Sequence, residues 1–371
     1  MKKKKKIDPD QIEEEFYAKD KKAGRQERKV ASQKDRSKYK KTDFDKFQEE
    51  LSKEILSKLD RDKLLKGRVI SIKSEGIIVD TPSGQLLCEL RGLLKKVKTR
   101  YKNLVAVGDF VLIEPLEHQE GFIYYVEPRK STLSRADTIS QKKQQLIAAN
   151  IDQVLITTSV GIPPLKPSLV DRYIIATDKG NMEPVIVVNK IDLLDGDDQK
   201  DLLERFVRAH EKSGIQVVLV SAETGEGIED LKAVMTDKAS VFSGQSGVGK
   251  SSLINVITGL DLKVGVVVDR TRKGAHTTTH ATLISLECGG WVIDTPGIKS
   301  FGMWDLDKEE LPFYFEEFAR YLPKCKFPNC SHLHEPDCAV IEAVEKGEIS
   351  RLRYESYAAL SKDIDEGYLR R

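Results

Sequence analysis

Gly244-Gln245-Ser246-Gly247-Val248-Gly249-Lys250-Ser251 is the stretch that decides the fold of this 371-residue chain. It fits the pattern GxxxxGK(S/T), in which glycines let backbone N–H groups curl around an anion and the lysine supplies a positive charge. Its surroundings agree, because residues 239–243 read as a short buried strand and residues 252–258 as an amphipathic helix. The stretch predicts a nucleoside triphosphate site, with Ser251 as a ligand of Mg²⁺.

A second motif, Asn189-Lys190-Ile191-Asp192, follows a predicted strand at residues 185–188. Ligand loops lie at this carboxyl edge of a parallel sheet. The motif matches NKxD, in which the Asp192 carboxylate accepts hydrogen bonds from N1–H and the 2-amino group of guanine. Adenine offers neither donor, so its binding would leave the carboxylate unpaired, and GTP is favoured. Ser221-Ala222 fits the loop whose backbone closes over the guanine, although alone it is a weak signal.

Two further segments follow the phosphate loop. Asp294-Thr295-Pro296-Gly297 matches DxxG, in which the aspartate holds the Mg²⁺ shell and the Gly297 N–H senses the γ-phosphate. Residues 274–280 supply threonines for the same ion, of which Thr278 is the predicted ligand beside Ser251. The predicted nucleotide-binding residues are Asn189, Lys190, Asp192, Ser221, Ala222, Gly244, Gln245, Ser246, Gly247, Val248, Gly249, Lys250, Ser251, Ser252, Asp294 and Gly297.

After residue 134, apolar runs of strand length alternate with amphipathic stretches of helix length. This alternation predicts a mainly parallel sheet covered by helices on both faces. The predicted strands are 153–158, 185–188 and 215–220, and the predicted helices are 169–176, 202–209 and 228–234.

The preceding region reads as five short strands broken by turns: 68–72, 76–80, 85–90, 109–114 and 122–127. Such a series suits a small Greek-key barrel of the oligonucleotide-binding type. Its longest connection could grip single-stranded or looped RNA through phosphates and one stacking ring, or could be a solvated loop on a structural barrel. The residues concerned are Arg91, Lys95, Lys96, Lys98, Arg100, Tyr101 and Lys102.

Composition narrows the class of protein. Charged residues make up 32% of the chain, and no apolar run is long enough to cross a membrane, so we expect no membrane partner. Residues 2–6 are lysines that no apolar stretch follows, so no secretory signal is expected. Residues 1–41 carry 16 Lys/Arg against 8 Asp/Glu, which suggests either a polyanion partner or a solubilising tail.

Cysteines gather near the C-terminal end, where Cys325, Cys330, His332 and Cys338 lie within fourteen residues. Three thiolates and an imidazole satisfy Zn²⁺ fully, as in structural zinc sites, and His334 is a competing ligand. The odd number of cysteines, five, favours a reducing compartment and hence a cytoplasmic location. Helices predicted at 311–321 and 339–360 flank the cluster, while Cys88 and Cys288 read as core residues.

The nucleotide motifs occur in the order NKxD, SA, phosphate loop, threonine loop, DxxG, whereas the ordinary order begins with the phosphate loop. The chain therefore reads as circularly permuted. With His276-Thr277-Thr278-Thr279, with DxxG running into Phe301-Gly302, and with the cysteine cluster, residues 66–360 resemble the RsgA/YjeQ family of circularly permuted GTPases. These enzymes depend on the small ribosomal subunit. The resemblance assigns zinc to the same four ligands.

The sequence thus predicts an α/β fold in four parts. A basic tail with a lead-in helix (1–60) precedes an OB-fold barrel (61–134), a circularly permuted GTPase domain (135–306) and a helical zinc-binding domain (307–371). The resemblance implies a monomeric GTP hydrolase that binds the small ribosomal subunit and its rRNA, is stimulated by it, and acts in its late maturation. A GTP-gated RNA-binding scaffold with incidental hydrolysis is the alternative, and a signalling GTPase with a protein effector is a third.

Catalysis is predicted to rest on Lys250, Thr278 and His276. Ile298 stands where familiar GTPases place a water-orienting glutamine, so slow intrinsic hydrolysis is expected. By resemblance, His276 is the candidate for the missing role. The alternative is a loop histidine that only shapes the switch.

Overall fold

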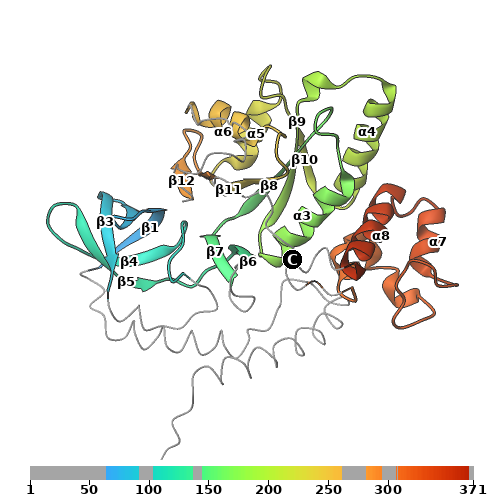
Figure 1. The fold of residues 1–371 in the computed structure, drawn as a ribbon, viewed down its shortest axis with the longest axis horizontal. Coiled ribbons are helices and arrows are strands. Elements are labelled where there is room, and N and C mark those ends of the chain that lie inside the picture. Colours follow the sequence, from blue (N-terminus) through green and yellow to red (C-terminus); the bar gives the residue numbers. More distant parts are fainter. Residues whose placement is uncertain are drawn as a thin grey trace, which may run out of the picture. The chain divides into compact units, whose positions relative to one another are not determined.

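The computed structural model describes residues 64–91, 103–136, 144–260, 281–294, 306 and 308–366 of the chain (Figure 1). These residues fall into two compact units: residues 62–306 with 350–371, and residues 307–349 together with the N-terminal segment. No helix in the described ranges is long and apolar enough to span a bilayer.

The first five strands close into a barrel: β1 (Leu65–Ile72), β2 (Ile77–Thr81), β3 (Gly84–Leu90), β4 (Phe110–Pro115) and β5 (Glu120–Val126). Neighbours pair in the order β1-β2-β3-β5-β4, and β4 returns to β1. Side chains alternate between the interior and solvent, and the interior includes Val69, Val79 and Val111. The predicted five-stranded barrel is confirmed, and Cys88 lies buried within it, where burial raises its pKa to about 11.

The second sheet contains β8 (Gln153–Ser159), β9 (Glu183–Asn189), β10 (Gln216–Leu219), β11 (Ala239–Ser243), β12 (Thr282–Ser285) and β13 (Trp291–Asp294). Its order is β10-β9-β8-β11-β13-β12, and every pairing is parallel except that of β12 with β13. The central strands β8 and β11 are buried along their whole length, as strands covered on both faces must be. The sequence analysis did not anticipate β12.

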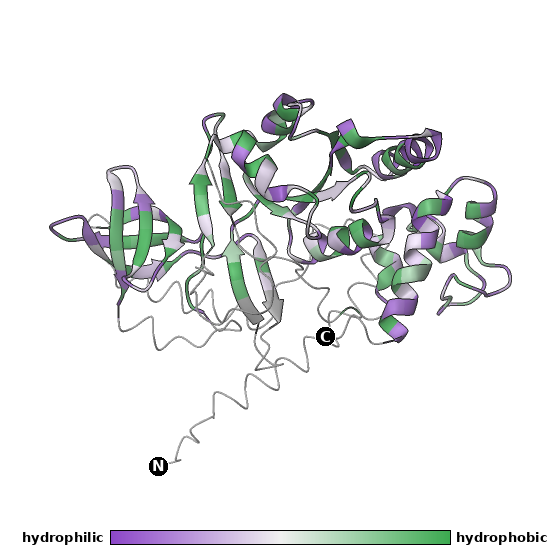
Figure 2. Ribbon diagram, turned by 45° about the horizontal axis from the view of Figure 1, so that its top comes forward, coloured by the Kyte–Doolittle hydropathy of each residue, from purple (hydrophilic) through white to green (hydrophobic). Residues whose placement is uncertain are grey.

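Helices cover both faces of this sheet, with α3 (Pro167–Lys179) and α4 (Asp197–Lys212) on one side and α5 (Ile228–Met235) and α6 (Lys250–Thr258) on the other (Figure 1). One core unites α5, α6 and the sheet through Leu231, Leu253, Phe242 and their neighbours. Figure 2 shows apolar residues concentrated along the strands. Cys288 packs, partly buried, against this core.

A hairpin that the sequence analysis missed joins the barrel to the sheet. Its strands β6 (Thr132–Ala136) and β7 (Gln144–Ala149) pair with each other in a separate two-stranded sheet. Asn150 follows it with a left-handed φ of 53°. The Asn150 side chain donates to Gly108 O (3.1 Å) and accepts from Lys130 N (2.9 Å), so this residue ties barrel and linker to the start of β8.

The C-terminal region differs from the prediction in two places. Residues 311–321 form short 3-10 turns, η4 (Leu311–Tyr314) and η5 (Glu316–Phe318), instead of an α-helix. Periodicity reports which residues are buried, and these turns bury the helical pattern Leu311, Tyr314 and Phe318 equally well. A further turn, η6 (Leu322–Lys324), precedes the cysteine cluster.

The prediction of one continuous helix over residues 339–360 is also wrong. Two helices form, α7 (Ala339–Glu345) and α8 (Arg351–Asp365), and they are separated at Gly347, whose φ of 72° ends α7. The second helix belongs to the larger unit, where it packs against α3 and α4.

Candidate functional site

The loop between β11 and α6 has the backbone that an anion site requires. Gly244, Gly247 and Gly249 all take positive φ, and Gly249 precedes the first turn of α6, where N–H groups point out of the helix. A methyl group on Gly244 would lie 2.1 Å from Thr157 O, so no other residue fits that close approach to β8. The loop is thereby fixed at the carboxyl edge of the sheet.

Lys250 folds back over this loop. Its Nζ donates to Gly244 O (2.8 Å) and Gln245 O (2.7 Å), which holds the ammonium against the first residues of the loop. Burial lowers the pKa of Lys250 to about 8, because a desolvated cation is less stable than one in water. An anion in the loop would restore the stability of the charged form.

Asn189 joins three of the predicted loops. This fully buried side chain donates through Nδ2 to Val248 O of the phosphate loop (2.9 Å) and accepts through Oδ1 from Ala222 N (3.1 Å). A methyl group on Gly249 would lie 2.3 Å from Asn189 Nδ2, so this glycine is required for the contact. One amide therefore fixes the NKxD, SA and phosphate loops relative to one another.

Asp192 is exposed but oriented. Its Oδ1 accepts from the buried Ser221 hydroxyl at 2.5 Å, and the same hydroxyl accepts from Thr224 N at 3.1 Å. The carboxylate is thus held at the rim of the site and can accept hydrogen bonds from a ligand that offers two adjacent N–H donors. The SA serine therefore acts through its side chain, whereas the sequence analysis considered only the backbone of this loop.

The neighbouring loop after β8 also contributes, and sequence reasoning missed it. Lys190, with a left-handed φ of 66°, donates through Nζ to Ile162 O at 2.7 Å. Ser159 Oγ donates to Pro163 O at 2.8 Å, and a methyl group on Gly247 would lie 3.6 Å from the Pro163 ring. The signal available was the Gly-Ile-Pro-Pro turn directly after a buried strand.

Several predicted residues lie outside what the structure describes. These are His276, Thr278 and Gly297, and most of the basic barrel loop. Asp294 is placed only as the last residue of β13, next to β11 and the phosphate loop. Arg91, at the start of the barrel loop, stacks over the Tyr124 ring at 4.2 Å and pairs with Glu114 at 3.1 Å.

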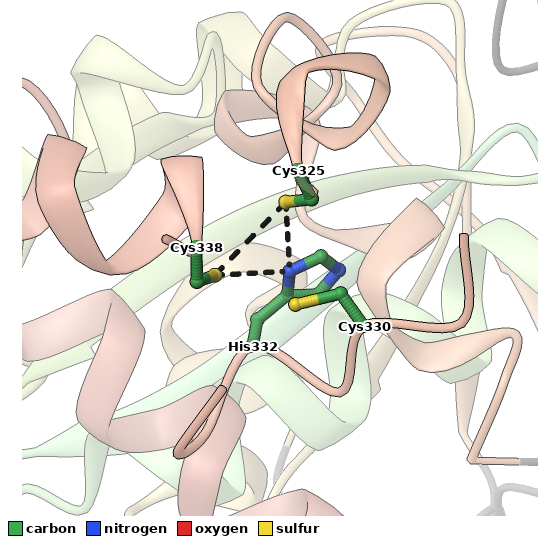
Figure 3. Close-up of side chains that lie close together, drawn as sticks. All are labelled: Cys325, Cys330, His332 and Cys338. Carbon is green, nitrogen blue, oxygen red and sulfur yellow. Dashed lines mark hydrogen bonds between the residues drawn. The ribbon is translucent and has the colours of Figure 1, made fainter. Parts of the chain in front are cut away.

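A second site lies in the smaller unit, where Cys325, Cys330, His332 and Cys338 point toward one another (Figure 3). Their ligand atoms all lie within 4.8 Å of one another. His332 Nδ1 is 3.5 Å from the sulfurs of Cys325 and Cys338, which are 4.0 Å apart. A tetrahedral zinc ion would set about 3.5 Å for nitrogen to sulfur and about 3.8 Å between sulfurs. The four residues therefore fit a closed zinc site.

The electrostatics of this cluster also suit a cation. Burial raises the pKa of Cys330 to about 12 and raises that of Cys338, so a bound cation is needed to hold both as thiolates. Burial lowers the pKa of His332, which favours the neutral imidazole that ligates metal. All five cysteines of the chain are free of disulfides. His334 is exposed and does not belong to the group.

Glu335 holds the loop that carries His332. Its carboxylate accepts from the backbone N–H groups of Ser331 (2.8 Å), Leu333 (3.3 Å) and His334 (3.3 Å). Burial alone would raise the pKa of Glu335, but these hydrogen bonds outweigh it and lower the pKa well below the usual range. The contacts stabilise the left-handed φ of 59° at His332 that aims its ring into the cluster.

Comparison with known proteins agrees with this geometry. The family model described as RsgA GTPase matches residues 126–304. A Chlorobaculum parvum protein named small ribosomal subunit biogenesis GTPase RsgA is 46% identical over 273 residues, which cover 71% of this chain and 86% of that protein. Its namesake from Chlorobaculum tepidum is 43% identical over 312 residues, covering 81% and 99%. This chain belongs to the RsgA family.

Solved structures extend the agreement to more than four fifths of this chain. YjeQ from Thermotoga maritima superposes with a TM-score of 0.65 at 35% identity, covering 81% of this chain and 98% of that one. YloQ, described as a circularly permuted GTPase, gives 0.66 at 30% identity, covering 83% and 97%. The permuted motif order that the sequence shows therefore agrees with the description of this solved structure. Membership makes this chain a GTP-hydrolysing enzyme.

Proposed function

We propose that this RsgA-family chain hydrolyses GTP on the small ribosomal subunit and acts as a checkpoint in its late maturation. The observation that carries the proposal is the frame around Asn189, which joins the phosphate loop to the NKxD and SA loops. In this proposal, the frame would hold a triphosphate cradle and a guanine reader at fixed separation. The choice of the small ribosomal subunit as partner is supported by the relatives, which are named for its biogenesis.

In this proposal, the phosphate-loop N–H groups and Lys250 hold the β- and γ-phosphates. Asp192, oriented by Ser221, accepts from the guanine, which excludes ATP. Ser251 and Thr278 would hold Mg²⁺, which when bound neutralises charge developing on the phosphates. Gly297 would sense the γ-phosphate, and Asp294 would support the ion.

His276 is proposed to orient the attacking water, since Ile298 cannot do so. The subunit would complete this arrangement, so hydrolysis should be slow without it. Binding as GTP and leaving as GDP would then follow from a γ-phosphate sensor that runs directly into the C-terminal region.

The zinc site is proposed to be structural, because the four ligands leave no position for water. The C-terminal segment of the smaller unit spans only residues 307–349, and a fold of that size gains stability from such a staple. The basic tail and barrel loop are proposed to contact rRNA phosphates. We also propose that the protein is a monomer and works in the cytoplasm, a reducing compartment in keeping with its five free cysteines.

The test is steady-state GTP hydrolysis by purified protein, measured with and without small ribosomal subunits. His276→Ala is assayed in parallel. We expect stimulation by subunits in the parent and its loss in the variant, with GTP affinity unchanged. A parent that binds subunits in a GTP-dependent manner but is not stimulated would instead be a GTP-gated scaffold. Salt-insensitive binding to the subunit would contradict phosphate contacts.

A further inference from the structure

The barrel is bonded to the part of the GTPase sheet that lies between the threonine loop and DxxG, here called the two sensor loops. Strand β12 begins two residues after the threonine loop, and β13 ends at the aspartate of DxxG. The two strands pair from Thr282↔Asp294 to Ser285↔Trp291 and so form one hairpin, here named the sensor hairpin (residues 282–294). Any shift of this hairpin moves the attachment points of both sensor loops.

Barrel strand β1 pairs with β12, the outer strand of the sensor hairpin, at one register position. Without it, β12 would be the unpaired edge of the sheet, with free N–H and C=O groups. Ser71 of β1 pairs with Thr282, at the end of the hairpin near the sensors. The barrel therefore touches the hairpin where the threonine loop leaves it.

Arg68, three residues earlier on β1, contacts the opposite end of the hairpin. Its guanidinium lies over the Trp291 ring at 5.6 Å and over the barrel's Phe110 ring at 5.1 Å, and it donates to Asn150 O at 2.9 Å. The two cation–π contacts favour the charged guanidinium, and because the group is planar they also fix its orientation against the rings. Arg68 thus joins the barrel to the sensor hairpin and to the start of β8.

Burying the charged guanidinium of Arg68 at this contact between barrel and hairpin costs free energy. Burial lowers the pKa of Arg68, and only the charge of Asp152 opposes that effect. The buried Nε has no hydrogen-bond partner among the described residues. An apolar side chain would fill the same space without the cost of desolvating a cation. The presence of an arginine here therefore suggests a role beyond packing.

We infer that the barrel acts as a built-in effector of the GTPase: β1 and the positioning residue Arg68 couple the pose of the barrel to the sensor hairpin. Nucleotide state then biases the barrel, and RNA bound by the barrel biases the sensors to the same extent, because coupling is reciprocal. The second half of this inference rests on the proposed function. The first half concerns this chain alone and can be tested without ribosomes.

The test uses the tryptophan at the joint as its own probe. The chain has two tryptophans, so Trp304→Phe leaves Trp291 as the only emitter. Acrylamide quenching of Trp291 is measured in the full chain with GDP and with a non-hydrolysable GTP analogue. We expect the quenching constants of the two states to differ by about 1.5-fold or more, and Arg68→Leu to remove the difference.

Lys66→Leu is the matched control. Lys66 lies on the same strand, also sits over the Phe110 ring (5.2 Å) and pairs with Glu127 of the barrel, and no contact joins it to the sensor hairpin in the described structure. It should leave the nucleotide-dependent difference intact. Arg68→Lys keeps the charge but loses the planar stacking, so it should retain only part of the difference in Trp291 quenching between the two nucleotide states.

Subunit-stimulated hydrolysis provides the second readout. Arg68→Leu should lower the stimulated kcat by about tenfold while basal hydrolysis and subunit affinity change less than about twofold. Equal quenching in the two nucleotide states, or a difference that survives Arg68→Leu, would overturn the coupling. So would equal losses in Arg68→Leu and Lys66→Leu. A parent with no subunit stimulation but an Arg68-dependent quenching difference would refute the proposed function and leave the coupling standing.

Discussion

Replacing Arg353 by Met should destabilise the larger unit severely, although this residue lies outside the nucleotide site. Arg353 on α8 is 2% exposed and donates to Asp171 Oδ1 on α3, a carboxylate that is 1% exposed. His210 Nε2 on α4 contacts the same oxygen at 3.1 Å, and its Nδ1 contacts Phe206 O at 2.8 Å. The variant would leave a buried carboxylate without its main counter-charge.

Removing one partner of a buried ion pair costs about 3–5 kcal/mol, a large share of the 5–15 kcal/mol that holds a typical domain. For a unit of this size, the loss corresponds to a fall in Tm of about 10 °C. The matched control is Arg172→Met, which breaks a pair with Asp363 between the same two helices. That pair is 30% and 37% exposed, so its loss should cost less than about 1 kcal/mol.

Thermal unfolding of the zinc-loaded chain, followed by far-UV circular dichroism, measures both variants. The double variant Arg353→Met/Asp171→Leu should recover at least about half of the loss, since it removes the orphaned charge. A fall in Tm no greater than that of Arg172→Met would refute the reasoning. So would additive losses in the double variant.

The ionisation of Asp171 determines how the stability difference between the parent and Arg353→Met depends on pH. Burial raises its pKa, but Arg353 and His210 outweigh burial and lower it below its ordinary value. A carboxylate with a lowered folded-state pKa contributes stability above its unfolded pKa of about 3.9, and that stability is lost as the pH falls further. In Arg353→Met, burial acts on this carboxyl without Arg353 to oppose it, so protonation relieves the variant at a higher pH. The difference in free energy of unfolding between the parent and Arg353→Met should therefore be largest near neutral pH and narrow as the pH falls toward and below about 4.

Three further outcomes are expected. GTP affinity should fall as the pH rises from about 8 to 9, because binding must then protonate Lys250, and Lys250→Arg should lack this fall in titration calorimetry. Gly249→Ala should displace Asn189 and so weaken GTP binding by about tenfold or more. Gly259→Ala is its control and should leave GTP affinity unchanged, because Gly259 also has a positive φ (+67°) but its added methyl would meet nothing within 4 Å. Cys338→Ser should abolish bound zinc measured by elemental analysis, whereas Cys288→Ser, outside the cluster, should retain it.

The barrel and the nucleotide loops were predictable because their signals are local. The phosphate loop, NKxD, SA and DxxG each directly follow an apolar run, so their expected positions at strand ends need no knowledge of distant residues. Turns such as Pro82-Ser83-Gly84 mark the barrel strands in the same way. The zinc ligands are also close in sequence, which limits the ways they can meet.

The features that escaped prediction depend on distant pairings. The contact of Arg353 with Asp171 joins residues 182 positions apart, and nothing local to α8 indicates that its arginine is buried. The role of Asn189 was predicted as part of NKxD, but its bond to Val248 O depends on how two loops meet across the sheet. Strand β12 is only four residues long and becomes a strand through its neighbours β13 and β1.

Circular permutation explains how the barrel reaches the sensor hairpin. In the ordinary order, the chain runs from DxxG on through the sheet, but here it is cut between β13 and β8. The starts of β8, β11 and β13 are adjacent, since Asp152 N donates to Ala239 O (2.9 Å) and Trp291 N donates to Lys238 O (2.9 Å). A barrel that precedes β8 therefore enters beside Trp291, at the edge of the sheet opposite the nucleotide. The antiparallel pairing of β1 with β12 sets Ser71 opposite Thr282, while Arg68 lies over the Trp291 ring at the other end of the hairpin. The cut thus gives the barrel contact with both ends of the sensor hairpin, whose strand β12 would otherwise be an unpaired sheet edge.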